Sequence, residues 1–340
     1  MEKVSLSTIA EKTGFSESTV SRVINGKARE FRISEKTEKK ILKAVKKLGY
    51  KPNPVAVNLR VKKSFTVGLI IPSLDNPFFV NITSILDKQL TERGYNIVLT
   101  ESYDDPEVEK KMIENLNSRN VDGIVLIPSK AKGGNPSLLE AISDHGVPVL
   151  CIDRYFKDSK IPYVTTDNVN GAYQAIELLI KNGHQNIACI QGIQDSTPAI
   201  DRKNGYLKAL QDNGLEPYEV SGNDFSIECG YREMNRILAR ENKPTAIFAM
   251  SSTIALGVIK AIEEAGLRIP EDFSLVGFDD NVFLDYLSTP LTTICQPVEE
   301  ISKIVSQALI NHIDGDITLS EFKSRELKPS LVQRKSVTGI

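Results

Sequence analysis

The chain has 340 residues, enough for roughly two or three domains of ~100–200 residues each. Its composition is 41% apolar and 25% charged without tryptophan, which excludes a collagen, a disulfide-stabilised mini-protein and a wholly disordered chain. No apolar run approaches the ~18 residues that span a bilayer, and the polar start MEKVSLSTIAEKTG lacks the apolar stretch of a secretory signal. We therefore expect a cytoplasmic protein with no membrane partner.

The cysteines exclude two further classes of protein. The four of them, Cys151, Cys189, Cys229 and Cys295, are scattered without CxxC spacing. This pattern argues against a zinc site or a dithiol redox centre and favours buried, reduced thiols. We expect neither a metal nor another cofactor.

Charge is distributed unevenly along the chain. Residues 1–63 carry 16 basic and 6 acidic side chains, whereas the remainder carries 26 basic and 38 acidic ones. Such asymmetry is typical of a nucleic-acid-binding head on an acidic body, although a merely solvated basic surface would give the same count.

Three short helices are predicted in the basic head. Leu6 and Ile9 fall at helical spacing before Gly14, Ser16 is a suitable N-cap for a second helix, and a third helix begins near Ser34. Two short helices joined by a glycine-containing turn form the helix-turn-helix unit that binds DNA. The alternative is a three-helix protein-binding domain with a basic surface.

The second helix of such a unit enters the major groove with its N-terminal part. Arg22 suits a bidentate contact with guanine, while serine hydroxyls suit phosphate. The candidate DNA-binding residues here are Ser16, Glu17, Ser18, Ser21, Arg22 and Asn25.

The run IAEKTGFSESTVSRVING, followed by LGYKPNPVAVNLR, resembles the DNA-binding head and hinge of the lactose-repressor (LacI) family of bacterial transcription regulators. The resemblance extends over residues 9–60. The segment KAREFRIS after Gly26 is a few residues longer than the usual family loop and is similar to the fructose- and sucrose-repressor branch. This similarity implies a role in sugar metabolism.

We expect the head to span residues 1–51 and a hinge to span residues 52–64. Residues 55–60 allow less than two turns of helix, which is marginal in isolation. The resemblance implies that this segment folds on the operator, with Leu59 wedged into the minor groove and Arg60 beside it. The alternative is a disordered linker without a role in DNA binding.

From residue 65 onward, apolar runs alternate with amphipathic stretches. Candidate strands span 67–71, 97–100, 123–127, 147–152, 163–166, 187–191, 246–250, 274–278 and 292–295. Candidate helices span 78–93, 106–119, 136–145, 168–182, 200–213, 227–240, 253–265 and 298–314. This alternation predicts α/β architecture with parallel sheets covered on both faces.

The body is too long for one comfortable sheet, and its pattern restarts near residue 187. It therefore predicts two doubly wound subdomains, similar to the type I periplasmic sugar-binding fold. We expect a first lobe at about 65–165 and 296–323 and a second lobe at about 166–295 and 324–340.

Ligands of such sheets bind beyond the carboxyl ends of the strands. The side chains expected there are carboxylates, amides, arginines and aromatic rings, which together suit a polyol. The candidate effector-binding residues are Ser73, Asn76, Phe78, Phe79, Asp104, Ser129, Asp153, Arg154, Arg202, Phe225, Ser251, Asp279 and Gln296.

The family resemblance assigns roles to some of these residues. It implies that Arg202 grips the ligand, Asp279 binds sugar hydroxyls, and Phe225 stacks on the ring. Many members carry Asn-Asp where this chain has Ser251-Ser252, which weakens a hydroxyl clamp and is compatible with a bulkier or phosphorylated ligand. Each assignment has a structural alternative: Phe78 or Phe79 as core, Arg202 as a surface ion pair, Asp279 as a helix cap.

The sequence thus predicts a homodimeric, sugar-responsive repressor of carbohydrate genes. A sugar-processing enzyme is the main alternative, but the chain lacks GxSxG, GxGxxG, GxxxxGK[ST] and HExxH motifs. Only KSVTGI follows Arg334, without the heptad tail that pairs dimers in the lactose repressor, so we expect a dimer and not a tetramer.

Overall fold

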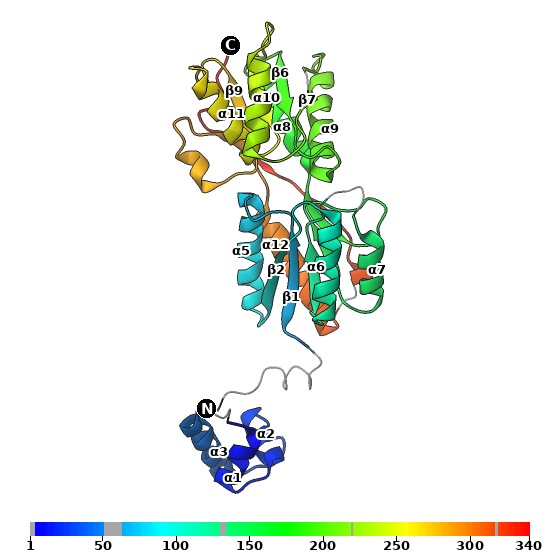
Figure 1. Cartoon of the computed structure of the whole chain (residues 1–340), viewed down its shortest axis with the longest axis vertical. Helices are drawn as coiled ribbons and strands as arrows, with labels where there is room; N and C mark the ends of the chain where they lie inside the picture. Colours follow the sequence, from blue (N-terminus) through cyan, green and yellow to red (C-terminus); the bar gives the residue numbers. More distant parts are fainter. Residues whose placement is uncertain (1–3, 51–62, 130–133, 219, 317–318) are drawn as a thin grey trace. The chain divides into compact units, whose positions relative to one another are not determined.

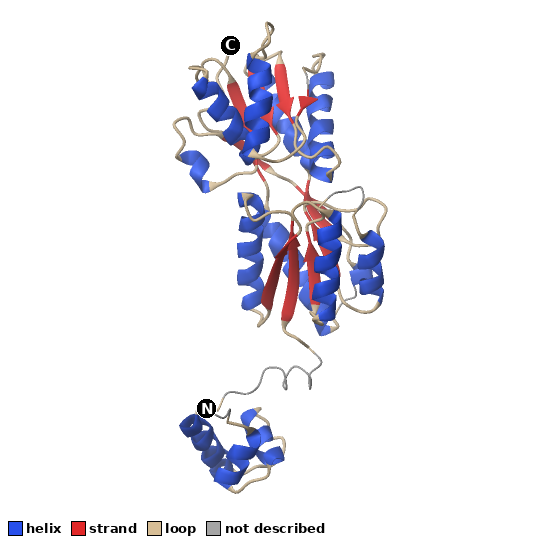
Figure 2. Cartoon of the chain, viewed as in Figure 1, coloured by secondary structure: helices blue, strands red, loops and turns tan. Residues whose placement is uncertain are grey.

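The computed structural model of the chain describes residues 4–50, 63–129, 134–218, 220–316 and 319–340. It divides into two compact units, Met1–Ser64 and Phe65–Ile340. The described part of the first unit is helical, whereas strands and helices alternate through the second (Figures 1 and 2). Leu59 and Arg60, for which we predicted minor-groove contacts, lie outside the described residues.

The first unit packs three helices around a small core within residues 4–50. The helices are α1 (Leu6–Thr13), α2 (Glu17–Ile24) and α3 (Glu35–Leu48). Each begins after a serine whose hydroxyl accepts a hydrogen bond from the backbone N–H three residues later, as the N-cap signals predict. The core consists of Ile9, Val20, Val23, Ala28 and Ile41.

The first lobe of the second unit is built on a parallel sheet of described strands in the order β11–β5–β4–β3–β1–β2. The strands are β1 (Thr66–Ile71), β2 (Asn96–Glu101), β3 (Gly123–Leu126), β4 (Val149–Ile152), β5 (Tyr163–Thr166) and β11 (Arg325–Leu327). Helices α5 (Pro77–Thr91) and α12 (Val298–Asp314) share one core with the sheet, and α6 (Pro106–Ser118) and α7 (Pro136–Asp144) share another.

The second lobe has the order β12–β10–β9–β8–β6–β7, in which only the pairing of β12 with β10 is antiparallel. Its strands are β6 (Ile187–Ile190), β7 (Val220–Ser221), β8 (Ala246–Ala249), β9 (Ser274–Phe278), β10 (Thr292–Cys295) and β12 (Ser330–Val332). Its helices form two packed pairs, α8 (Asn168–Lys181) with α9 (Thr197–Asp212) and α10 (Ile227–Leu238) with α11 (Ser252–Glu264). The 3-10 turns η1 (Val282–Asp285) and η2 (Leu319–Glu321) complete the described elements.

The chain passes between the two lobes three times: from β5 to α8, from β10 to α12, and from β11 to β12. This architecture of two doubly wound lobes is the one that the sequence predicts. One expected boundary is wrong. Because β11 pairs with β5 of the first lobe, the chain returns to the second lobe after residue 327 and not at residue 324.

Candidate functional site

Helix α2 presents polar side chains to solvent along its length. Its exposed residues are Glu17, Ser18 and Arg22, and Asn25 is exposed at its C-cap. Ser16 caps the helix, and its hydroxyl accepts a hydrogen bond from the backbone N–H of Thr19 at 3.2 Å. Ser21 is half-buried, and the Asn25 side chain donates to its hydroxyl at 3.2 Å. Arg22 is therefore the strongest candidate on this face for reading a base edge.

Arg22 is held by a contact that the sequence does not reveal. Its guanidinium lies 4.0 Å from the ring centre of Phe31, which belongs to the lengthened segment after α2. Phe31 itself is 42% exposed. This cation–π contact restricts the arginine while leaving its donors toward solvent. The longer loop thus has a structural role that no spacing rule suggests.

The head retains an excess of positive charge at its surface. The lysines of α3 are exposed at Lys36, Lys39, Lys40, Lys43, Lys46 and Lys47. Within residues 4–50, only Lys27 and Lys39 form ion pairs, with Glu30 and Glu35. The other cations of the head, which form no ion pair within these residues, can neutralise the phosphate backbone of a nucleic acid.

Side chains of both lobes of the second unit line a cleft with an outer and an inner cavity. The outer cavity has a volume of 610 Å³ and is lined by Ser73, Asp75, Asn76, Phe79, Asp104, Arg154, Ile193, Asp224, Phe225, Ser226, Ile227, Glu228 and Thr253. The inner cavity holds only 20 Å³ and is lined by Asn76, Phe78, Phe79, Asp153, Arg154, Pro198, Arg202, Phe225 and Asp279. Most of the predicted effector residues therefore lie together.

Arg202 forms the base of the inner cavity. Its Nε donates to Oδ1 of Asn168 at 2.8 Å, Nη1 donates to the carbonyl of Met250, and Nη2 lies 3.7 Å from Oδ1 of Asp279. The guanidinium also stacks 3.6 Å from the ring centre of Phe278. Arg202 is 2% exposed, so it is a buried ion-pair partner and not a surface one.

Asp279 follows β9 with φ of 70°, a left-handed conformation that aspartate tolerates. Its Oδ1 accepts a hydrogen bond from Nε2 of Gln296 at 2.6 Å. Burial raises the pKa of the Asp279 carboxyl, while the charge of Arg202 and the Gln296 hydrogen bond oppose that rise. Asp279 does not cap η1, whose N-cap is Asn281.

Asp153 follows β4 in the same left-handed conformation, with φ of 61°. It is buried, and its Oδ1 has no hydrogen-bond partner within the described structure. Burial raises the pKa of this carboxyl to about 6, against the charges of Arg202 and Arg154. An unsatisfied buried acceptor at the wall of the inner cavity would accept a ligand hydroxyl.

Asp153→Asn should remove a pH-dependent cost to stability. Because the folded-state pKa of Asp153 lies above its ordinary value, wild type should lose stability relative to the variant as pH rises from about 4 to 6. The relative loss should reach about 3 kcal/mol and stay constant above that window. Asparagine also tolerates positive φ, so the backbone should be preserved. Urea unfolding of both proteins at pH 4, 5, 6 and 7.5 measures the difference, and parallel pH profiles would contradict the assignment.

Arg154 separates the inner from the outer cavity. Its Nη1 donates to Asp104 and to the carbonyls of Pro128 and Ser129. Its guanidinium lies 5.6 Å from the ring centre of Phe79 and 5.8 Å from that of Phe225, one from each lobe. A buried arginine between two rings links the lobes across the cleft.

The three phenylalanines of the cleft differ in their surroundings. Phe78 and Phe79 are 6% and 4% exposed and belong to the first-lobe core at the start of α5, where Asn76 is the N-cap. Phe225 is half-buried and lies against Gly192 so closely that a Cβ there would be 2.2 Å from its ring. Phe225 is therefore the most exposed of the three rings, and it packs on the backbone at Gly192.

Three predicted effector residues line neither cavity. Ser251 is the N-cap of α11 and accepts a hydrogen bond from the backbone N–H of Ile254 at 3.1 Å. Gln296 orients the Asp279 carboxylate by donating a hydrogen bond to it. Ser129 is buried, and its backbone N–H donates to Glu109 at 2.7 Å. In this structure they support residues that line the cleft.

Several residues that line the outer cavity were not predicted from the sequence. Asp224 and Glu228 flank Ser226, the N-cap of α10, and Thr253 lies in the first turn of α11. A signal was available, since Asn-Asp-Phe-Ser before an apolar period marks a helix start at the same edge of the sheet. The carboxylates of Asp75, Asp104, Asp224 and Glu228 line the outer cavity, whereas Arg154 is the single cation among its described lining residues. The outer cavity is therefore acidic.

The described residues give little support for a histidine-based catalytic site, a reactive thiol or a metal site. His184 bonds to Thr245 and to the carbonyl of Thr338, and the histidines do not line the cleft. The four cysteines are free thiols, and only Cys295 is not fully buried. Within the same described residues there is no cluster of three potential metal ligands, and no helix has the length and apolarity needed to cross a bilayer.

Comparison with known proteins gives matches over almost the whole chain. A family model described as "Bacterial regulatory proteins, lacI family" matches residues 5–53, and one described as "Periplasmic binding proteins and sugar binding domain of LacI family" matches residues 64–329. The chain is 31% identical to the ribose operon repressor of Haemophilus influenzae, with 98% of each chain covered. It is 32% identical to the transcriptional repressor PurR of Actinobacillus pleuropneumoniae, again over 98% of each. Among solved structures it is similar to the Lac repressor dimer bound to operator and the anti-inducer ONPF, with a TM-score of 0.88, 28% identity and coverage of 99% of this chain and 100% of that one.

Proposed function

The chain belongs to the LacI family of bacterial regulatory proteins, and on this premise we propose that it represses carbohydrate-utilisation genes in the cytoplasm, as a homodimer released from or recruited to its operator by a sugar. The observation that carries the proposal is a helix-turn-helix head with a polar exposed face on α2, in one chain with a cleft lined by hydroxyl-binding groups and aromatic rings. The chain is a DNA-binding regulator and not an enzyme.

In this proposal the exposed face of α2 reads the operator. Glu17, Ser18, Ser21, Arg22 and Asn25 supply contacts to base edges and phosphates, and Ser16 adds a phosphate contact at the helix start. Leu59 and Arg60 extend the contact into the minor groove. Two heads related by a two-fold axis require a near-palindromic operator.

Exposed apolar side chains on the body support the proposed dimer. Leu74 and Val80 of the first lobe are 47% and 43% exposed, and Val282 and Tyr286 of the second lobe are 75% and 84% exposed. Such side chains stabilise a protein best when a partner covers them. A second copy of the chain is the occupant that the proposed palindromic binding requires.

The charges of the cleft favour a neutral sugar over a sugar phosphate. Both arginines of the cleft are already paired, Arg154 with Asp104 and Arg202 with Asp279. The outer cavity adds the carboxylates of Asp75, Asp224 and Glu228. A phosphate dianion entering this site would meet unbalanced negative charge, whereas hydroxyl groups could donate to the carboxylates.

The experiment that tests the function combines operator selection with a ligand screen. Genomic fragments enriched by binding to the full-length protein supply the DNA, and fluorescence anisotropy then follows its release or tightening with neutral sugars, sugar phosphates and purine bases. We expect enrichment of a near-palindromic site and a response to a neutral sugar. Failure to enrich any site, or a response only to a purine base, would contradict the proposal.

Arg22→Ala should weaken operator binding by about 1–3 kcal/mol and relax base preference at one position of each half-site. Phe31→Ala should weaken it less, by about 1 kcal/mol, because it frees Arg22 without removing it. Binding to randomised operators measures both effects. Equal weakening on every sequence would instead make Arg22 a phosphate contact, and Lys47→Ala, on exposed α3 surface, provides a comparison for loss of charge alone.

A further inference from the structure

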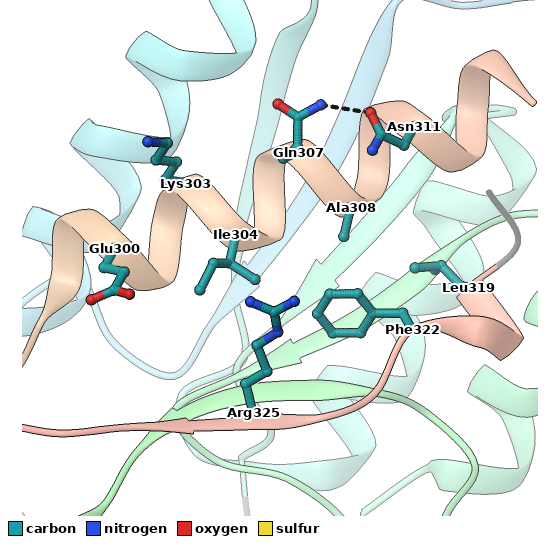
Figure 3. Close-up of a pocket in the computed structure, with 9 residues that line it drawn as sticks. All are labelled: Glu300, Lys303, Ile304, Gln307, Ala308, Asn311, Leu319, Phe322 and Arg325. Atoms are coloured by element: carbon teal, nitrogen blue, oxygen red, sulfur yellow. Dashed lines mark hydrogen bonds between the residues drawn. The ribbon is translucent and has the colours of Figure 1, made fainter. Parts of the chain in front are cut away.

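The first lobe contains a second cavity, distinct from the cleft, between α12 and the segment from η2 to β11 (Figure 3). Its volume is 390 Å³, within the range of roughly 300–1,000 Å³ that is usual for small-molecule sites. Its lining is mainly apolar and includes Ile304 and Ala308 of α12 with Leu319 and Phe322 opposite them. None of these residues lines either cleft cavity.

The apolar wall is recessed. Leu319 is buried, and Ile304, Ala308 and Phe322 are half-buried, so that none of them is among the exposed large apolar side chains of the described surface. A recessed concave wall suits a small molecule better than the flat surface of another protein. The protruding apolar residues assigned above to the dimer lie on other segments.

Cationic side chains lie at the edge of this wall. Lys303 and Arg325 are exposed, and within the described residues no ion pair to a carboxylate is found for either, although Glu300 also lines the cavity. In Figure 3 the Arg325 guanidinium faces Ile304 and the edge of the Phe322 ring, and its centre is 5.8 Å from the ring centre. The five donors of a guanidinium beside an apolar wall suit a ligand that carries a carboxylate.

We propose that this cavity binds a small amphipathic monoanion, a carboxylate on an aromatic ring or short alkyl chain. The apolar body packs on Ile304, Ala308 and Phe322, and the carboxylate accepts hydrogen bonds from Arg325 and the Lys303 ammonium. The ligand holds α12 against β11. These two elements adjoin two of the three connections between the lobes, because α12 begins after Pro297 and β11 ends at Leu327.

The test uses the fluorescent anion 8-anilinonaphthalene-1-sulfonate with the full-length protein. We expect one saturable site per chain, from which octanoate displaces the probe about tenfold more effectively than octylamine does. Arg325→Gln should weaken probe binding about tenfold by removing the charge. Ala308→Trp should abolish binding by filling the cavity. Lys323→Gln, an exposed neighbour that does not line the cavity, is the matched control and should bind as wild type.

The results of these experiments distinguish a small anion in the cavity from a second copy of the chain. Unchanged probe binding in Arg325→Gln and Ala308→Trp, or equal displacement by octanoate and octylamine, would overturn the proposal. Light scattering on Ala308→Trp tests whether the cavity is part of a contact between two copies of the chain. A change in oligomeric mass would assign the cavity to that contact and not to a small anion. Arg325 is exposed, so its substitution should leave the fold intact and keep the test valid if the tryptophan variant misfolds.

Discussion

Arg202→Ala should lower the free energy of unfolding by about 3–5 kcal/mol and abolish the response to the sugar. The substitution removes the hydrogen bonds to Asn168 and Met250, and it leaves Asp279 and Asp153 buried with less compensating charge. It also removes the donors at the base of the inner cavity, where we propose that the ligand binds. Denaturant unfolding and calorimetric titration of the sugar identified by screening measure the two effects.

Control variants distinguish a loss of sugar binding from a general loss of stability. Lys208→Ala removes an exposed cation from the same helix, α9, and should change neither quantity appreciably. Operator affinity without sugar should be retained in Arg202→Ala at temperatures where it is folded, because the head has its own core. Asp279→Asn should also lower the affinity for the sugar. Wild-type sugar affinity in both cleft variants would place the ligand elsewhere.

Gly230→Ala should destabilise the second lobe by about 3 kcal/mol or more. Helices α10 and α11 touch through their backbones, and a Cβ on Gly230 would lie 2.0 Å from the carbonyl oxygen of Ile254. The contact is reciprocal, since a Cβ on Gly257 would lie 2.0 Å from the carbonyl oxygen of Ile227. Because these obstacles are backbone atoms, the helices must separate before either side chain fits.

Urea unfolding at neutral pH measures this effect as a lower midpoint with an unchanged slope. Asn235→Ala, at an exposed position on the same helix, serves as the comparison and should shift the midpoint little. A Gly230→Ala midpoint equal to that of wild type would mean that the helices repack at no cost and that the close approach is dispensable.

Regular periodicity was enough to predict most of the fold. The expected helix over 298–314 has the bounds of α12, and the expected strand over 67–71 differs from β1 by one residue. The two- and three-residue strands β7, β11 and β12 were not predicted, because so few residues carry no period. The misplaced lobe boundary at residue 324 follows from the missing β11.

The candidate site could be predicted only in part, for a different reason. The rule that ligands bind beyond strand ends identifies Asp153 and Asp279, since their positions follow from the strands alone. It does not distinguish Ser251, which caps α11, from a side chain that lines the cleft. The contacts of Arg154 with Phe79 and Phe225, and of Arg22 with Phe31, depend on how separate segments pack together, which periodicity does not encode.

The return of the chain to the first lobe affects the order in which the protein can fold during synthesis. Helix α12 packs on α5 and the sheet so closely that a Cβ on Gly123 would lie 2.8 Å from the Leu309 side chain. A nascent chain that has not yet emerged from the ribosome beyond residue 298 must therefore leave that face of β3 and β4 uncovered, although β1 to β5 are already made. The lobe that is begun first is thus completed only after most of the second lobe has been translated. Until then its uncovered apolar surface is the kind of surface that chaperones bind.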